Sequence, residues 1–244
     1  MIGTLSYLAF VLANIPTSFV VNQAGAYVKQ QDIAIGEATG TVWNGAVTLL
    51  AKHNDNKLPP ISMSWRLQLL KILIFQPPFH YQINGVGFQL EGDLGITPRM
   101  VSIANTEGQL SSSLINNFTK AEGVEISGQV ELKDLNLTIN FLGRETADAE
   151  GELYWGGGEV VYKQGSHPIS IDFPAVKGVF SHNEGSLELK IADAAEGKVI
   201  GNIEIAPTGW AKVSVMKRVL EMAGQMNVGK NGDKPLIEVQ QKLF

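Results

Sequence analysis

The residues that could carry out chemistry are few in this chain, and their spacing builds no recognisable reaction centre. The four histidines are His53, His80, His167 and His182, and cysteine is absent. None of the histidines has the H-x-x-x-H or H-E-x-x-H spacing that places two metal ligands on one face of a helix. We therefore expect no metal site and no cofactor, and the composition excludes a disulfide framework within the chain.

Two further groups of residues could serve a reaction. Asp148, Glu150 and Glu152 alternate along a predicted strand, but a solvated strand edge explains them better than a general acid and base. The run Gly156 to Gly158 would need a following helix to hold a phosphate, and the residues after it are β-like, so we expect a turn or bulge. No nucleophile elbow or phosphate-binding loop motif occurs. The sequence therefore predicts no catalytic residues, and nothing in it favours the alternative of an unrecognised enzyme.

The start of the chain is uncharged and apolar, because the first charged residue is Lys29. An apolar helix of about 20 residues can cross the roughly 30 Å hydrocarbon layer of a membrane. We expect residues 1–22 to be a transmembrane anchor, helical from Ile2 to about Ile15 or, past Pro16, to Val21. The anchor residues are Leu5, Leu8, Phe10, Leu12, Ile15, Pro16 and Phe19.

Two alternatives to the anchor stay open: a cleaved signal peptide and a buried core segment. A signal peptide has a positively charged start and a small-residue cleavage site. A signal anchor carries Lys or Arg on its cytoplasmic side. No basic residue precedes Lys29, although cleavage within residues 22–26 (NQAGA) remains open. Because no basic residue precedes the apolar run, we expect that the chain starts a few residues too late.

The rest of the chain has the composition of an all-β protein with many turns. Glycine accounts for 26 of the 244 residues and only 18% are charged. The net charge of −5, with both signs interspersed, argues against a nucleic-acid partner. Short helices are expected at 68–74 and 214–226, the second amphipathic. Alternating apolar residues predict mostly antiparallel strands at 32–38, 40–50, 61–67, 79–84, 86–94, 100–104, 123–132, 136–142, 149–154, 158–163, 169–173, 176–182, 186–192, 198–205 and 236–243.

Two short stretches recur in the same order along the chain. TVWNG at 41–45 is echoed by LYWGG at 153–157, and PISMSW at 60–65 by PISIDF at 168–173. We expect a duplicated β unit, in which each Trp-containing strand pairs with a Pro-Ile-Ser strand. The halves would be 23–120 and 121–244, continuous in one extended or curled sheet. We expect Trp43 and Trp155 to pack in the core.

The end of the apolar run and the motif behind it resemble a known family. Residues 12–20 (LANIPTSFV) look like the end of the anchor in protein N of the bacterial type II secretion system, and the G-T-V-W-N-G motif of that family occurs here unchanged. A later W-x-L segment, a Trp-Gly-Gly strand and a GDKPL ending at 232–236 are also similar. The resemblance thus spans nearly the whole chain. Its motif residues, expected to be structural, are Gly40, Thr41, Val42, Trp43, Asn44, Gly45, Trp65, Trp155, Gly156 and Gly157.

The resemblance implies a single-pass inner-membrane component of the type II secretion machinery of Gram-negative bacteria, with its bulk in the periplasm. Other secretion components, of unknown identity, would be its partners, and no reaction is implied. We expect a structural or interaction subunit in the export of folded proteins. The alternative is a periplasmic β-groove that binds lipid or another hydrophobic ligand, because alternation such as GVEISGQVEL at 123–132 suits a groove as well as a core.

Overall fold

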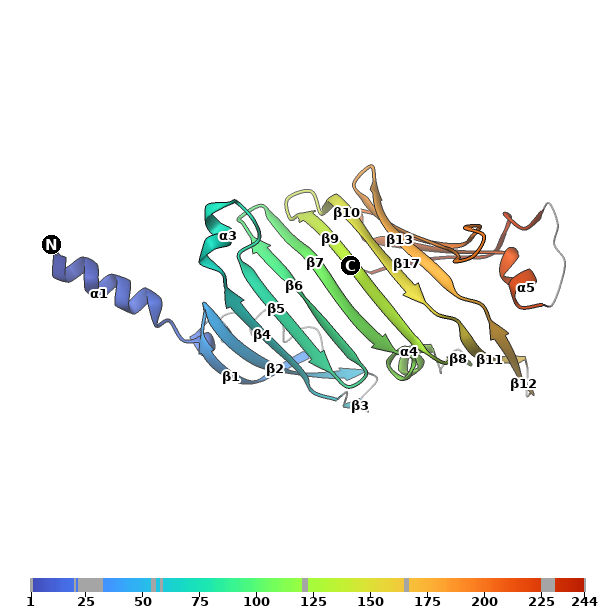
Figure 1. The fold of residues 1–244 in the computed structure, drawn as a ribbon, viewed down its shortest axis with the longest axis horizontal. Coiled ribbons are helices and arrows are strands. Elements are labelled where there is room, and N and C mark those ends of the chain that lie inside the picture. The colour runs from blue at the N-terminus through green and yellow to red at the C-terminus, as the bar shows by residue number, and fades with distance from the viewer. Residues whose placement is uncertain are drawn as a thin grey trace. The chain divides into compact units, whose positions relative to one another are not determined.

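The computed structural model describes residues 2–19, 21, 33–53, 56–57, 59–119, 123–164, 167–224 and 231–243. The chain divides into two units, Met1–Leu94 and Gly95–Phe244. Strands make up most of both units, and each pairing described below is antiparallel (Figure 1). The predicted class, mostly antiparallel β with a few short helices, is confirmed.

The first unit contains an N-terminal helix and an antiparallel sheet in which sequence neighbours pair. The sheet order is β1-β2-β4-β5-β6, and the short strand β3 pairs with β2. Short turns join most of these strands, which favours antiparallel neighbours. The elements are α1 (Ile2–Ala13), β1 (Ile33–Thr41), β2 (Asn44–His53), β3 (Asn56–Lys57), β4 (Ile61–Leu67), α3 (Leu69–Leu73), β5 (Phe79–Gly85) and β6 (Phe88–Ile96).

The second unit contains a larger antiparallel sheet and a small three-stranded one. The larger sheet runs β7-β9-β10-β13-β14-β15-β16-β17, and the smaller runs β12-β11-β8. The elements are β7 (Met100–Ser111), α4 (Ser112–Thr119), β8 (Val124–Ile126), β9 (Gln129–Asn140), β10 (Glu145–Trp155), β11 (Gly158–Gln164), β12 (His167–Phe173), β13 (Val176–Asn183), β14 (Ser186–Asp193), β15 (Val199–Ile205), β16 (Trp210–Met216), α5 (Arg218–Met222) and β17 (Pro235–Lys242).

The sheet of the first unit has one apolar face and one polar face. Val47 lies opposite Met63, which lies opposite Ile83, which lies opposite Leu90. Side chains alternate between faces along a strand, so their neighbours in sequence form the other face. That face carries Thr48, Ser62, Ser64, Gln82, Asn84, Gln89 and Glu91. The strict alternation of the sequence therefore translates directly into a two-faced sheet.

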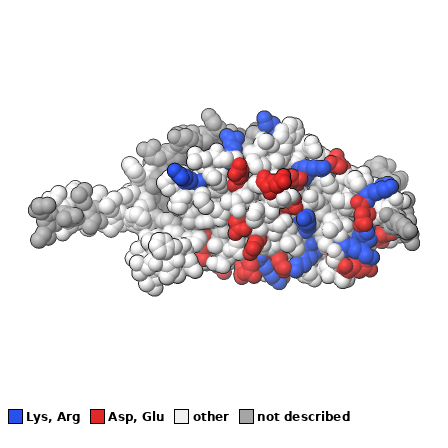
Figure 2. Space-filling view, turned by 90° about the horizontal axis from the view of Figure 1, so that it is seen from above, with Lys and Arg blue, Asp and Glu red and all other residues white. Residues whose placement is uncertain are grey.

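The larger sheet of the second unit has the same two-faced character, with ion pairs along its polar face. Their N···O distances are 3.1 Å for Lys133–Glu131, 2.5 Å for Lys177–Glu152, 3.2 Å for Lys190–Glu188 and 2.5 Å for Lys212–Glu238. Hydrogen bonds to Glu131 and Glu238 raise the pKa of Lys133 and Lys212, respectively, above the ordinary value for lysine. Figure 2 shows both signs of charge interspersed. Except for Lys190–Glu188, whose carboxylate is buried, these pairs are exposed and add little to stability.

The core of the second unit lies where a second layer covers the apolar face. Val130, Trp155, Val176 and Ile200 are buried together. Their partly buried neighbours come from both sheets and from α4 and α5: Leu110, Ile115, Ile126, Leu153, Val160, Phe173, Ile191, Val219 and Met222. The Trp155 ring stacks on Phe173 with ring centroids 6.0 Å apart, and its Nε1 donates to the Ser127 carbonyl at 2.9 Å. The prediction that Trp155 packs in the core is confirmed.

The structure corrects several predicted elements. The predicted strand 40–50 is two strands, because Val42 and Trp43 form the turn between β1 and β2. The two strands predicted between 123 and 142 are replaced by the short β8 and one long β9. β9 continues through Asp134 (φ 49°), where the strand forms a bulge. The polar residues at this bulge led to the prediction of a turn between two strands. The helix predicted at 214–226 is only α5, because residues up to Met216 belong to β16.

The structure does not show the predicted duplication. β1 pairs with β2 across a hairpin, whereas β10 and β11 lie in different sheets. The Pro-Ile-Ser strand β12 pairs with β11, so its predicted pairing with the Trp155 strand is wrong. The two halves with a boundary at 120/121, and their continuity, stay a prediction.

Replacing Trp155 with alanine should destabilise the second unit by about 3–5 kcal/mol, because it removes a buried ring and leaves a cavity. Tyr154→Ala is the matched control, since Tyr154 is 39% exposed on the polar face of the same strand, and should cost roughly 1 kcal/mol or less. Urea unfolding of the full chain, followed by circular dichroism, measures both. Equal losses for the two variants would contradict the position of the core.

Candidate functional site

The N-terminal helix is shorter than the predicted anchor. α1 has 12 residues and no acidic or basic residue, and at 1.5 Å per residue it is about 18 Å long. It ends because Pro16 disfavours helix at the residue before it and because the Asn14 side chain donates to the Phe10 carbonyl at 2.8 Å. The predicted continuation as one helix past Pro16 is therefore wrong. In the part of the chain that the structure describes, no helix combines the length and apolarity needed to cross a membrane.

The side chains of this segment are apolar and largely exposed. Among the predicted anchor residues, Phe10, Leu12 and Phe19 are 67%, 55% and 60% exposed, whereas Ile15 is half-buried and Pro16 exposed. The side chains of Leu5 and Leu8 lie outside the described part. Figure 2 shows no charged side chain on the helix, which is white and grey. An exposed apolar segment of this kind is typical of a surface that contacts an apolar environment or a partner.

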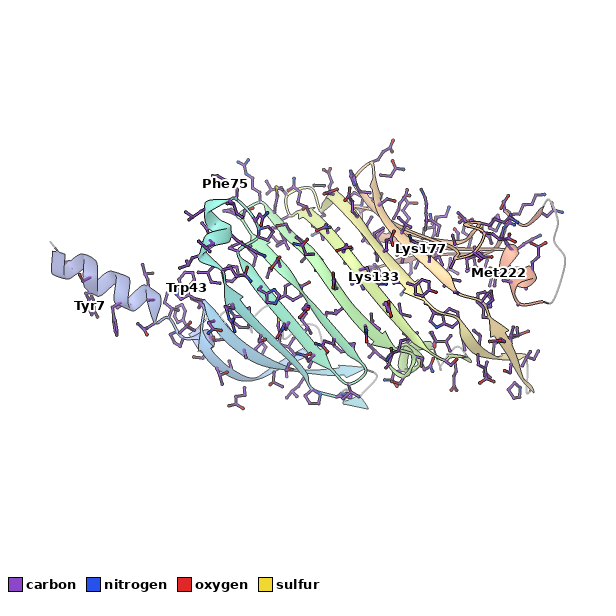
Figure 3. All side chains as sticks on the ribbon, in the orientation of Figure 1. Tyr7, Trp43, Phe75, Lys133, Lys177 and Met222 are labelled. Atoms are coloured by element: carbon purple, nitrogen blue, oxygen red, sulfur yellow. The ribbon has the colours of Figure 1, made fainter. Side chains whose placement is uncertain are left out.

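The end of the helix is held by the turn between β1 and β2. The Trp43 indole Nε1 donates to the Leu12 carbonyl at 2.8 Å, and the Val42 amide donates to the Ile15 carbonyl at 3.0 Å. Pro16 forms an antiparallel bridge with Thr41. We call residues 12–17 together with 41–45 the helix–turn junction; Trp43 is labelled in Figure 3. The junction thus supplies one donor for the Leu12 carbonyl in the last turn of α1 and one for the Ile15 carbonyl just after the helix.

Trp43 is therefore not the core residue that the sequence predicts. Its side chain is 36% exposed at the tip of a hairpin, and its one N–H is used on the helix. Trp65 supports the turn from the neighbouring strand, because its Nε1 donates to the Val42 carbonyl at 3.0 Å. The Leu67 amide donates to the Trp43 carbonyl at 2.6 Å. The motif and Trp65 thus belong to one hydrogen-bonded network that joins the β1–β2 turn to β4.

The glycines of the motif are required by space and by backbone conformation. Gly40 has φ 80°, in the left-handed region that other residues rarely adopt. A Cβ on Gly45 would meet the side-chain oxygen of Thr17, the Thr41 carbonyl oxygen at 2.7 Å and the Trp65 ring at 2.8 Å. Thr17 is only 1% exposed, so the chain after Pro16 packs directly on Gly45. Glycine permits this close approach.

The second glycine motif lies in the other unit and also serves close packing. Gly157 has φ 84°, and a Cβ there would meet the Phe173 carbonyl oxygen at 2.5 Å. β11 follows directly at Gly158, so a strand and not a helix follows these glycines, whereas the expected turn or bulge stays a prediction. Gly156 differs, because the nearest atom to a Cβ at that position is 3.9 Å away.

The titratable residues singled out in the sequence are distributed over separate places. His182 Nδ1 accepts from the Ala149 amide at 3.3 Å and lies 3.6 Å from Asp148. Glu152 is in the ion pair with Lys177, and Glu150 is exposed. His53 and His167 lie in β2 and β12. Among the described residues, no three of the potential metal ligands His, Cys, Asp and Glu come together.

One buried polar cluster was missed by the sequence reasoning. Asp93 is 5% exposed, and its carboxylate lies 2.5 Å from Lys71 Nζ and 3.4 Å from His80 Nδ1. Asp93 and His80 are register partners on β6 and β5, whereas Lys71 comes from α3. No local signal in the sequence joins residues so far apart. The cluster attaches α3 to the polar face of the sheet.

Comparison with known proteins identifies one related family. The model of type II secretion system protein N matches residues 31–228, which include most of both β units. Searches of curated proteins and of solved structures give no significant match.

Replacing Trp43 with phenylalanine should loosen the helix–turn junction, because it keeps a ring but removes the donor to Leu12. The loss of one hydrogen bond, about 0.5–1.5 kcal/mol, corresponds to roughly 2- to 10-fold faster hydrogen exchange at the neighbouring Val42 amide. Trp210→Phe, at a 48% exposed position of the second unit, is the control. Unchanged exchange at Val42, or an equal change in the control, would refute the role of the indole.

Proposed function

Because the chain belongs to the type II secretion system protein N family, we propose that it is a non-enzymatic structural and interaction subunit of that machinery. The family match carries this proposal, since it covers 31–228 and hence the motif, most strands of both units and the core. Membership makes the chain a type II secretion component. The finer assignment, to an inner-membrane protein with its β units in the periplasm, belongs to the proposal.

The helix–turn junction supports the membrane-attached part of the proposal. α1 carries no charge and exposes large apolar side chains, including Tyr7 at 67% and Phe10 at 67%. A segment of this character is stable in the apolar layer of a membrane and poorly solvated in water. The junction connects it to the first sheet through hydrogen bonds. Attachment would confine the β units to the membrane surface and raise their effective concentration near other envelope components.

The outer edge of the second unit supports the interaction part. β17 is the last strand of its sheet order, and all of its residues are exposed. Leu236, Ile237 and Val239 are 40%, 53% and 53% exposed. An edge strand presents backbone donors and acceptors that a partner strand can use, and alternate apolar side chains give such pairing its selectivity. We assign β17 as the contact with another secretion component.

A photo-crosslinking amino acid at Ile237 should capture another secretion component in intact cells that contain the whole system. The same amino acid at Val179, which is 43% exposed on the central strand β13, should capture much less. Mass spectrometry of the adducts gives the readout. No adduct at Ile237, or equal capture at both positions, would exclude β17 as the partner edge.

A second candidate function, binding of lipid or another hydrophobic ligand, is favoured by the apolar face of the first sheet. On that face Val47 and Tyr81 are buried, whereas Met63, Ile83 and Leu90 retain partial exposure. A face of this kind can hold an acyl chain along the strands, because apolar burial is non-directional.

Native mass spectrometry of the full chain after mild detergent extraction tests the second candidate. Bound lipid should appear as adducts whose number falls in Ile83→Asn, because the amide interrupts the apolar face. Gln82→Asn on the polar face is the control and should keep the adducts. Spectra without lipid adducts on the unaltered chain would count against this candidate.

A further inference from the structure

The segment Leu69–Phe75, which we call the α3 tip, exposes an unusual amount of apolar surface. Leu69, Leu70, Leu73, Ile74 and Phe75 are 68%, 78%, 74%, 61% and 98% exposed. Single exposed apolar residues are common on protein surfaces, but a contiguous group of large ones marks an interaction site. The five side chains come from consecutive turns of one short segment, so they form such a group.

The polarity of the α3 tip is the reverse of that of a helix in water. Lys71 is the only charged residue between Leu67 and His80. Its amine points back to the sheet and pairs with the buried Asp93 at 2.5 Å. A helix on a water-soluble protein turns its charges outward and its leucines inward. Here the charge is turned inward and neutralised, so the outer surface of the tip carries no net charge.

The backbone holds this surface in a fixed position. The Gln68 amide donates to the Pro78 carbonyl at 2.7 Å, and the Gln76 amide donates to the Lys71 carbonyl at 3.0 Å. Phe75 has φ 55°, a left-handed conformation that bulky residues rarely adopt. The local structure therefore places the Phe75 ring outward in spite of backbone strain.

The α3 tip lies at the same end of the first sheet as the helix–turn junction. Leu67, the last residue of β4, donates its amide to the Trp43 carbonyl at 2.6 Å, and Trp43 in turn donates to Leu12. The tip begins two residues after Leu67. Figure 3 shows Trp43 and Phe75 at this end of the first unit, with Tyr7 on the helix that leaves from it.

We infer that the α3 tip inserts into the interfacial layer of the same lipid bilayer that receives α1. This inference rests on the membrane attachment in the proposed function. A bilayer is favoured over a protein partner because protein interfaces surround their apolar centre with a polar rim, whereas Leu69–Ile74 offers only apolar side chains and an inward-facing lysine. A short apolar segment at a membrane surface binds with its side chains at the boundary of headgroups and acyl chains. The first sheet is then attached to the membrane at two points.

Site-specific labelling of the full chain tests this inference, and the absence of cysteine makes single-cysteine variants straightforward. Phe75→Cys, Tyr7→Cys and Val86→Cys are each labelled with an environment-sensitive fluorophore and reconstituted in vesicles of phosphatidylethanolamine and phosphatidylglycerol. Val86 is the matched control, because it is 67% exposed and apolar but lies in the turn after β5, at the opposite end of the same sheet. Quenching by spin-labelled lipids reports contact with the bilayer.

We expect quenching at positions 75 and 7 that is severalfold stronger than at position 86. Quenching at 7 but not at 75 would overturn the inference and leave the proposed attachment through α1 standing. No quenching at 7 would overturn that attachment and the inference together. Equal quenching at 75 and 86 would indicate adsorption without orientation and would also overturn the inference.

Discussion

The hydrogen bond from the Trp43 indole to the Leu12 carbonyl attaches the last turn of α1 to the sheet of the first unit. It joins the helix to the sheet at the point where the helix runs out of internal donors. The same turn is also bonded to β4, since the Trp43 carbonyl accepts from the Leu67 amide and the Val42 carbonyl accepts from the Trp65 indole. Three segments that are separate in sequence are thereby joined at two turn residues: the end of α1, the β1–β2 hairpin and β4, which leads directly into the α3 tip.

Beyond the junction, both units are organised by alternation of apolar and polar residues. In the second unit the apolar face is closed by α4, α5 and the small sheet, and Trp155 becomes a core residue. In the first unit the corresponding face keeps partial exposure, and the exposed apolar groups concentrate at one end. The two tryptophan motifs are similar in sequence, but Trp155 packs in a core whereas Trp43 donates a hydrogen bond to the end of a helix, because their neighbours in space differ.

The fold class follows from the sequence, because alternation depends only on neighbouring residues. Most strands lie close to their predicted positions for this reason, and α3 was visible as a short apolar run before Gln76. Failures occur where distant residues decide the outcome. β9 continues through the bulge at Asp134 because it pairs with β7 on one side and β10 on the other. Residues up to Met216 have helical spacing but belong to β16, because they pair with β17. The family motif was recognisable by its letters, but its role in capping α1 was not, because Leu12 and Trp43 are joined only by folding.

The strand order has a consequence for the way the chain is built. Within each unit most strands lie beside the strand that precedes them in sequence, so each new strand finds its partner already formed. The sheet can grow one strand at a time from the N-terminal side, with one growing edge that moves along the chain. β8, β11 and β12 leave this order to form their own layer, because β7 pairs across β8 with β9, and β10 pairs across β11 and β12 with β13. Growth of this kind suits a polypeptide that becomes available gradually from its N-terminus, and β17 is the last of these strands to join.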